Sequence, residues 1–373
     1  MDLLTAAARA MRAVIRSTTR APVLVAIIFV GCGFGTLGAT LTTAAAAAQP
    51  PTTTRPHVVV IVMENKEASQ VLGNRSAPYL NSLVRRYGLA TQSFGVTHPS
   101  LPNYLALTSG STQGITSDCT SCSVNAPNIV DQLTRAGVSW KAYLEGYPGH
   151  CFTGATAGAY AKRHNPFIYY TDVAHDRARC SRFVGFGALS ADLRAGQLPT
   201  YSWITPSVCN DTHDCGVAVG DRFLAATVPS LLSALGPHGF LVLTWDEGAS
   251  NAGCCGGAAR GGHIATLVAG PDVIPGSRES SPVDHYGVLA TIERALALPL
   301  LGQAANPHNG GLDPLLRPQP VVHPTHAQWV WLHGVYIPAH FAPGSRARVW
   351  TRLTTNPKAA LALVHHYGPA GIR

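Results

Sequence analysis

The chain has 373 residues, of which 46% are hydrophobic and 12% charged. This composition is typical of a folded protein with a sizeable core and excludes a disordered chain. The net charge is +8, but the basic residues form no stripe interleaved with aromatic residues, so we expect no nucleic-acid partner.

Residues 1–48 have the pattern of an export signal. Four arginines precede an apolar run from Ala21 to Val30, and small residues continue to Ala48. This order predicts a secretory signal peptide with cleavage near Ala48, and therefore a secreted or cell-envelope protein. Two alternatives remain open: the segment is kept as a membrane anchor, or Cys32 is acylated as in a lipoprotein.

Eight cysteines follow the signal region, an even number that favours disulfides in an exported chain. Pairing of neighbours would join residues 119 with 122, 151 with 180, 209 with 215, and 254 with 255, although the sequence does not prove this connectivity. A zinc site is the alternative for Cys119 and Cys122. No second Cys or His pair stands at finger spacing, which favours the disulfide.

A Pro/Thr-rich linker at 49–56 leads into alternating strands and helices. The β-branched run His57–Met63 predicts a strand buried on both faces of a parallel sheet. We therefore expect an α/β fold, a three-layer sandwich with a mostly parallel central sheet. The other predicted elements are a helix over 78–88, a helix over 127–136 capped by Asn125, strands over 140–144 and 201–205, a helix over 221–235, strands over 239–245 and 264–269, and a helix from 284 or 285 to about 297, with 146–200 rich in loops.

A serine stands where one of the predicted helices begins. Ser100 precedes Pro102, a residue suited to the first turn of a helix, and the apolar run from Tyr104 to Thr108 follows. Free N–H groups and the helix dipole favour an anion at such a position. Ser100 could therefore attack a phosphorus atom while N–H groups hold the phosphoryl oxygens. The alternative is that Ser100 only caps the helix.

Acidic pairs follow the two most apolar strands. Glu64-Asn65 comes after the first and Asp246-Glu247 after the second. Ligands of α/β sheets bind beyond the carboxyl ends of the strands, and hard divalent cations prefer oxygen ligands of these kinds. We expect a divalent metal ion of unknown identity, which would also activate Ser100. The alternative for each acidic residue is a helix cap or a solvated loop.

Several histidines are candidates for binding phosphate oxygens, protonating a leaving group or ligating metal. They are His164, His213, His263 and His285. The alternative for His213, with Asp211 and Asp214, is that all three decorate a loop between Cys209 and Cys215.

Together these motifs resemble the acid phosphatase/phospholipase C phosphoesterase family of the alkaline-phosphatase-like superfamily, and they look most similar to secreted actinobacterial acid phosphatases. They occur in the family's order over about residues 57–316. The motifs are Met63-Glu64-Asn65, Thr97 to Tyr104, Lys162 to Phe167, Asn210 to Asp214 with Gly220-Asp221, Leu243 to Glu247, and Asp284-His285-Tyr286 with Ile292-Glu293.

The resemblance implies a role for each matching residue. Ser100 would be the nucleophile that forms a phosphoserine intermediate and also a metal ligand. His213, with Asp211 or Asp214, would bind phosphate and donate a proton. The remaining implied roles are metal binding by Glu64, Asn65, Asp246 and Glu247, and substrate binding by His164, His263, His285 and Asn103.

One difference between this chain and the family pattern favours the acid phosphatase branch of the family over the phospholipase C branch. Phospholipase C members usually have Arg near the Pro-Asn step, where this chain has Tyr104. We therefore expect an exported, metal-assisted acid phosphatase that hydrolyses phosphate monoesters, with phosphoinositides among the candidate substrates. A phospholipase C-like phosphodiesterase remains the alternative, as does an inactive cell-envelope protein that binds partners through its extension at 317–373. The role of that extension and the oligomeric state are open.

Overall fold

The computed structural model describes residues 55–257, 259–318, 329–332 and 335–338. The predictions made for residues 1–48, and for most of the linker and the extension, lie outside these ranges. Within the extension, β12 (Trp329–Leu332) and β13 (Val335–Pro338) pair as an antiparallel two-stranded sheet.

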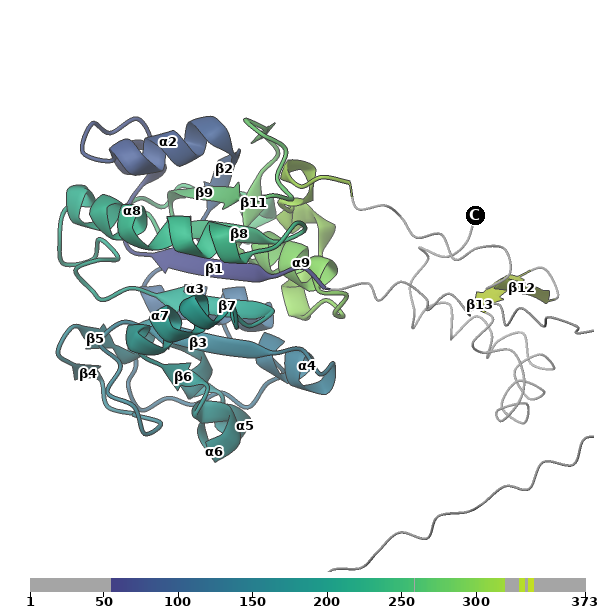
Figure 1. Ribbon diagram of the computed structural model, residues 1–373, viewed down its shortest axis with the longest axis horizontal. Coiled ribbons are helices and arrows are strands. Elements are labelled where there is room, and N and C mark those ends of the chain that lie inside the picture. Colours follow the sequence, from purple (N-terminus) through teal and green to yellow (C-terminus); the bar gives the residue numbers. More distant parts are fainter. Residues whose placement is uncertain (1–54, 258, 319–328, 333–334, 339–373) are drawn as a thin grey trace, which may run out of the picture. The chain divides into compact units, whose positions relative to one another are not determined.

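A nine-stranded sheet forms the middle of the fold (Figure 1). Its strands are β1 (Val58–Met63), β2 (Gly88–Phe94), β3 (Trp140–Leu144), β6 (Phe183–Val184), β7 (Tyr201–Thr205), β8 (Phe240–Trp245), β9 (His263–Ala269), β10 (Arg278–Glu279) and β11 (Val283–Asp284). Their spatial order is β10-β2-β9-β8-β1-β7-β3-β6, and β11 also pairs with β2. A separate small hairpin joins β4 (Thr156–Ala157) to β5 (Tyr160–Ala161).

The sheet is mostly parallel, as predicted. The central strand β1 runs parallel to β7 on one side and to β8 on the other. Among these nine strands β9 alone runs in the opposite direction, because it is antiparallel to both β8 and β2. The carboxyl ends of β1, β7 and β8 therefore meet at one edge of the sheet.

Helices cover both faces of the sheet (Figure 1). Val58, Val60 and Val62 of β1 belong to the core on one face, and the intervening side chains of β1 belong to the core on the other. This alternation confirms the predicted three-layer sandwich. The first core is covered by α3 (Ser100–Ser109), α4 (Ile129–Arg135), α5 (Thr171–Ala174) and α9 (His285–Ala295), and the second by α1 (Ala68–Val71), α2 (Pro78–Arg86), α7 (Phe186–Ala195) and α8 (Val217–Ala234).

By length and composition α8 is the one described helix that could cross a membrane. Its packing indicates another role, because Phe223, Leu224, Val228 and Leu231 are buried in the core beneath it. We assign α8 to the outer layer of the sandwich.

Some local predictions were wrong. Asn128, not Asn125, caps α4: its side chain accepts from the Asp131 N–H while the Asp131 carboxylate accepts from the Asn128 N–H. The loop-rich prediction for 146–200 missed α7 and the short α6 (Arg177–Cys180). Strand β2 was also missed, because the polar residues in its sequence hide the pattern of a buried strand.

The four neighbour disulfides are confirmed. Cysteine pairs 119–122, 151–180, 209–215 and 254–255 are each bonded. Cys119 and Cys122 are therefore bonded to each other and do not form the alternative zinc site.

Candidate active site

Three buried carboxylates meet at the carboxyl ends of the central strands. Glu64 follows β1, Asp246 follows β8, and Asp211 lies in the loop after β7, all with side chains 0% exposed. Backbone bonds fix their positions: Glu64 N donates to Asp211 O at 2.8 Å, and Asp246 N donates to Met63 O at 2.9 Å. Glu64 and Asp246 therefore lie together at this edge, as expected for residues that follow parallel strands, and Asp211 joins them.

Ser100 faces this cluster from the first turn of α3. Its Oγ donates to Glu64 Oε2 at 3.0 Å. Tyr104 lies one helical turn further on, and its hydroxyl donates to the other carboxylate oxygen, Oε1. Residues four apart share one face of a helix, so α3 presents two hydroxyls to a single carboxylate.

Asn103 braces the loop that leads to Ser100. Its Oδ1 accepts from the N–H groups of Val96 and Thr97, at 2.8 and 3.1 Å. Its Nδ2 donates to the carbonyls of Thr97 and Pro99, at 2.8 and 3.1 Å. The side chain is 0% exposed. Contact with substrate stays a prediction for Asn103, and in this structure its amide holds the backbone of the loop instead.

His164 lies between two of the carboxylates. Its Nε2 is 3.3 Å from Glu64 Oε1, and its Nδ1 is 3.2 Å from Asp211 Oδ2. Both ring nitrogens are fully buried, yet neither has a hydrogen-bond partner, and the same is true of Asp211 Oδ2 and Asp246 Oδ2. Buried polar atoms without partners are rare in proteins and call for an explanation.

The cluster is electrostatically unfavourable without a cation. Burial, and then the carboxylates of Asp246 and Asp211, raise the pKa of Glu64 well above its usual value. Burial raises the pKa of Asp211 to about 7 and also raises that of Asp246. Burial, and then the neighbouring Arg163, lower the pKa of His164 to about 3. A bound cation would offset the repulsion between carboxylates and reverse these shifts of the acids.

The residues present fit a divalent cation. Glu64, His164 and Asp211 each offer a ligand atom, and these atoms lie within 4.8 Å of one another. Carboxylate and imidazole ligands suit several divalent metals, and a cation would satisfy the partnerless atoms of His164 and Asp211. This donor set differs from the predicted one, since it adds Asp211 and His164 to Glu64.

Two residues of the predicted metal set have other partners. Glu247 is bonded to His98 Nδ1 at 2.5 Å, and burial, followed by the charge of Asp246, raises its pKa to about 9. Asn65 has a left-handed backbone, with φ of 54°, and its Nδ2 donates to Glu64 Oε2 at 3.4 Å. Metal ligation by Glu247 and Asn65 stays a prediction.

The His213 ring is held between an acidic and a cationic side chain at the edge of the cluster. Its Nδ1 lies 2.6 Å from Asp214 Oδ1, and its Nε2 lies 3.1 Å from Arg163 Nη2. A guanidinium can only donate, so Nε2 accepts and Nδ1 carries the proton given to Asp214. The backbone N–H of His213 also donates to Asp211 Oδ1 at 2.7 Å. In this arrangement Nε2 holds no proton for a leaving group while Arg163 remains in place.

The remaining predicted histidines differ in placement. His285 is fully buried, its Nε2 bonds to Asp246 O, and burial lowers its pKa to about 4. His263 begins β9 at the same edge of the sheet, but its Nε2 bonds to Thr91 O at 3.0 Å and its ring packs on Phe94. His285 therefore contacts the cluster, whereas His263 points to β2.

Three site residues were not assigned from the sequence: Tyr104, Arg163 and Asp118. Tyr104 could have been found from its four-residue spacing after Ser100. Arg163 precedes His164 in a motif that was recognised, but its contact with His213 depends on how two loops meet. Asp118 lies in a further loop, where its Oδ1 accepts from Leu101 N at 2.9 Å.

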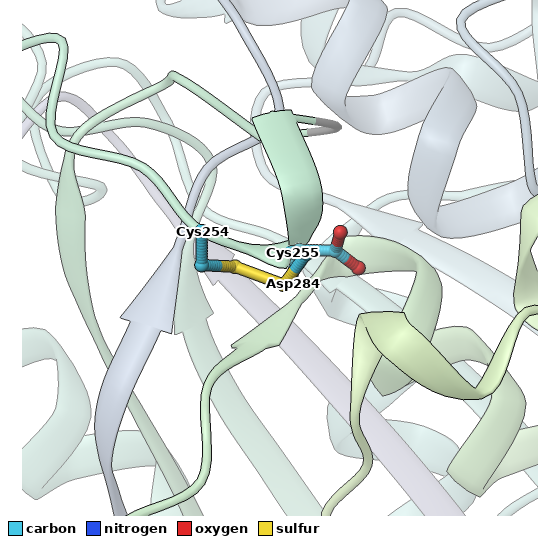
Figure 2. A group of neighbouring side chains, drawn as sticks. All are labelled: Cys254, Cys255 and Asp284. Carbon is cyan, nitrogen blue, oxygen red and sulfur yellow. A yellow bond between two sulfur atoms is a disulfide. The ribbon is translucent and has the colours of Figure 1, made fainter.

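A second group of potential ligands contains Cys254, Cys255 and Asp284 (Figure 2). The two sulfurs are joined in a disulfide, so neither is a thiolate able to bind a metal. Asp284 caps α9, where its side chain accepts from the N–H groups of Tyr286 and Gly287. In this oxidised form the group does not constitute a metal site.

Comparison with known proteins identifies the family to which this chain belongs. The chain belongs to the Phosphoesterase family, whose model matches residues 70–299. Among its relatives is the phosphatidylinositol-3-phosphatase of Mycobacterium tuberculosis, which is 35% identical over 249 residues, or 66% of this chain and 78% of the relative. The acid phosphatase of Aspergillus fumigatus is 28% identical over 228 residues, or 58% of this chain, which spans about half (49%) of that relative.

A solved structure of an alkaline phosphatase superfamily protein from Vibrio parahaemolyticus aligns with a TM-score of 0.48 and 15% identity, over 65% of this chain and 67% of that one. The sequence relatives support the activity. The protein is a hydrolase that acts on phosphate esters.

Proposed function

We propose that the protein is an exported phosphomonoesterase of the acid phosphatase type that uses Ser100 as its nucleophile. The observation that carries the proposal is the hydrogen bond from Ser100 Oγ to Glu64 at the centre of the buried acidic cluster. A serine hydroxyl is a weak nucleophile and needs a neighbouring group to accept its proton or lower its pKa. The cluster supplies both an acceptor and a place for a cation.

The chemistry assigned to the chain has two steps. Ser100 Oγ attacks phosphorus, its proton passes to Glu64 Oε2, and the bond from phosphorus to the ester oxygen breaks. The departing oxygen takes a proton from His213 Nε2, after that nitrogen has been released by Arg163 and protonated from solvent. Water then attacks the phosphoserine and gives a proton to His213 Nε2, while Glu64 returns its proton to Ser100 Oγ as the bond from phosphorus to this oxygen breaks and phosphate leaves.

A divalent cation fits the donor set of Glu64, His164 and Asp211, with Asp246 beside it. When bound, such a cation supplies positive charge against the phosphoryl oxygens and lowers the pKa of the serine hydroxyl. Tyr104 holds the other oxygen of Glu64 and so keeps this carboxylate oriented toward Ser100.

Export and substrate class are parts of the same proposal. The signal pattern in residues 1–48 and the four disulfides support an extracytoplasmic location. The name of the M. tuberculosis relative supports a phosphorylated inositol headgroup as one candidate substrate. Relatives named as phosphatases favour monoesters over the diesters that a phospholipase C would cleave.

The test is hydrolysis of para-nitrophenyl phosphate and of its bis-ester by wild type and Ser100→Ala, each with and without a chelator. We expect monoester turnover that is lost in Ser100→Ala and reduced by the chelator, with folding unchanged by circular dichroism. Ser109→Ala is a matched control, because Ser109 ends the same helix and its side chain bonds to the backbone of Leu105 and Ser111, to Gln113 and to Tyr170.

Each contrary result has a distinct meaning. Substantial turnover by folded Ser100→Ala would refute the assigned nucleophile. A preference for the bis-ester would move the protein to the phosphodiesterase branch. Monoester turnover that depends on Ser100 but withstands exhaustive chelation would retain the nucleophile and remove the metal from the proposal.

A further inference from the structure

A continuous series of contacts runs from Ser100 around the site to Arg163. Ser100 Oγ bonds to Glu64 Oε2 at 3.0 Å, and Glu64 Oε1 lies 3.3 Å from His164 Nε2. The His164 ring lies against the ring of His213, with centroids 5.7 Å apart. His213 Nε2 then accepts from Arg163 Nη2 at 3.1 Å.

Asp118 closes this series back to the nucleophile. Its Oδ1 accepts from the N–H of Leu101, the residue after Ser100, at 2.9 Å. Its Oδ2 lies 3.6 Å from Arg163 Nε. One carboxylate therefore spans a backbone donor beside the nucleophile and a guanidinium. These are the kinds of donor that bind a phosphate group in proteins.

The environment of Arg163 differs from that of nearby lysines. Lys66 and Lys162 each donate to a backbone carbonyl, at 2.7 and 2.6 Å. Arg163 instead contacts two side chains, His213 and Asp118, with the looser contact to Asp118. The side chains of Arg163 and Asp118 are 24% and 32% exposed, so a ligand from solvent can reach both.

Buried atoms of the neighbouring acidic cluster also lack partners. Both nitrogens of His164 and Oδ2 of Asp246 are fully buried and have no hydrogen-bond partner. These atoms belong to the cluster that fits a cation, and the His164 ring joins that cluster to His213, the partner of Arg163.

We propose that Arg163 and the Leu101 N–H form the phosphate-binding subsite beside Ser100, and that the Asp118 carboxylate occupies this subsite until a phosphate displaces it. The proposal rests on the proposed function, because it places the phosphate at Ser100. When the phosphate takes the place of Asp118, the Arg163 fork turns to the phosphate oxygens. His213 Nε2 then loses the donor that it has in this structure.

If phosphate displaces the Asp118 carboxylate, substitutions of Asp118 and of Arg163 should change the phosphate affinity in opposite directions. Asp118→Asn keeps the shape and an acceptor oxygen but removes the competing charge. We expect phosphate to bind about fivefold more tightly, the factor for one like charge about 4 Å away in water. Arg163→Ala removes a charge-assisted pair of bonds and should weaken binding roughly tenfold or more. Arg163→Lys should fall between, because an ammonium lacks the planar fork.

The experiment measures binding of inorganic phosphate by calorimetry to the purified, metal-supplied chain in the Ser100→Ala background. Asp118→Asn, Arg163→Ala and Arg163→Lys are compared with that parent. Two controls make the same charge changes elsewhere: Asp172→Asn, whose partner Arg179 keeps its bond to Asp131, and Arg222→Ala on the exposed face of α8. Both controls should leave phosphate affinity unchanged.

The sign of the Asp118→Asn effect decides between displacement and a structural role. Tighter binding in Asp118→Asn together with weaker binding in Arg163→Ala supports the proposal. Unchanged or weaker phosphate binding in Asp118→Asn overturns it. If the Asp118 carboxylate only braced α3, its loss would not strengthen phosphate binding. Unchanged binding in Arg163→Ala also overturns it.

A second readout separates this proposal from the proposed function. In chains that retain Ser100, Arg163→Ala should raise KM for para-nitrophenyl phosphate and Asp118→Asn should lower it. Phosphate affinity in the Ser100→Ala background does not depend on turnover. If Ser100→Ala still turned over substrate, the nucleophile would be wrong while the binding series still tested the subsite.

Discussion

Glu293 on α9 provides the sharpest test of the electrostatics of this fold, away from the catalytic cluster. Its side chain is 0% exposed, and its two oxygens accept from the Leu301 N–H at 3.1 and 3.2 Å. Burial raises its pKa from 4.5 to about 8. The folded protein therefore holds a proton on this carboxyl across a pH range in which the unfolded chain has released it.

The sign and size of the effect follow from linkage. Between pH 4.5 and about 8 the folded state binds one more proton than the unfolded state at this group, so stability falls as pH rises. Stability from Glu293 is fully present below pH 4.5 and is lost by pH 8. A shift of this size corresponds to about 5 kcal/mol, at about 1.36 kcal/mol for each pH unit.

Glu293→Gln is a neutral replacement of the same shape. Its amide can accept from Leu301 N and donate to Gln132 Oε1, a buried atom with no partner. We expect the variant to match wild type within about 1 kcal/mol at pH 5 and to be several kcal/mol more stable at pH 9. Urea unfolding with disulfides intact, from pH 5 to 9, measures the difference.

Glu279→Gln, which removes one charge from a partly buried side chain of β10, controls for the loss of a charge. A Glu293→Gln difference that is flat across the range, or that favours wild type increasingly toward pH 9, would refute the reasoning.

Three further predictions concern the site. Tyr104→Phe removes a hydrogen bond to a carboxylate, worth about 1.5–3 kcal/mol, and should lower kcat roughly 10- to 100-fold with the fold retained by circular dichroism. Asn103→Ala removes four bonds to the loop before Ser100, and should lower both Tm and kcat; an unchanged Tm would exclude the bracing role. Chelation should lower Tm as well as turnover, since a cation at 100 times its Kd adds about 2.7 kcal/mol; a chelator-insensitive Tm in both wild type and Asp211→Asn would argue against a cation there.

The strands at the centre of the sheet could be predicted because burial on both faces leaves a continuous apolar run. β1 and β8 are entirely buried, and their sequences are almost entirely apolar. β2 could not be predicted in this way, since Thr91 and Gln92 interrupt its apolar residues. Its position in the sheet depends on pairing with β9 and β10. The reversed direction of β9 is likewise a property of chain topology, which local sequence does not encode.

The position of the acidic cluster could be predicted from the sequence, but the contacts of its individual side chains could not. Residues that follow parallel strands must meet at one edge, which brought Glu64 and Asp246 together. The partners of individual side chains depend on loops: Glu247 bonds to His98, and Asp118 reaches Leu101 from 17 residues away. No periodic pattern predicts such meetings, and this is why Arg163 and Asp118 were found only in the structure.

The arrangement of the disulfides has a consequence for how the chain acquires them. Bonded residues are separated by 3, 29, 6 and 1 positions, and no bridge begins before the previous one has ended. Eight cysteines allow 105 pairings, yet each of the eight in the described part of the chain is bonded to its neighbour in the series. For a polypeptide that enters an oxidising compartment from its N-terminus, each correct partner is the next to arrive, so simple order of emergence favours the native set.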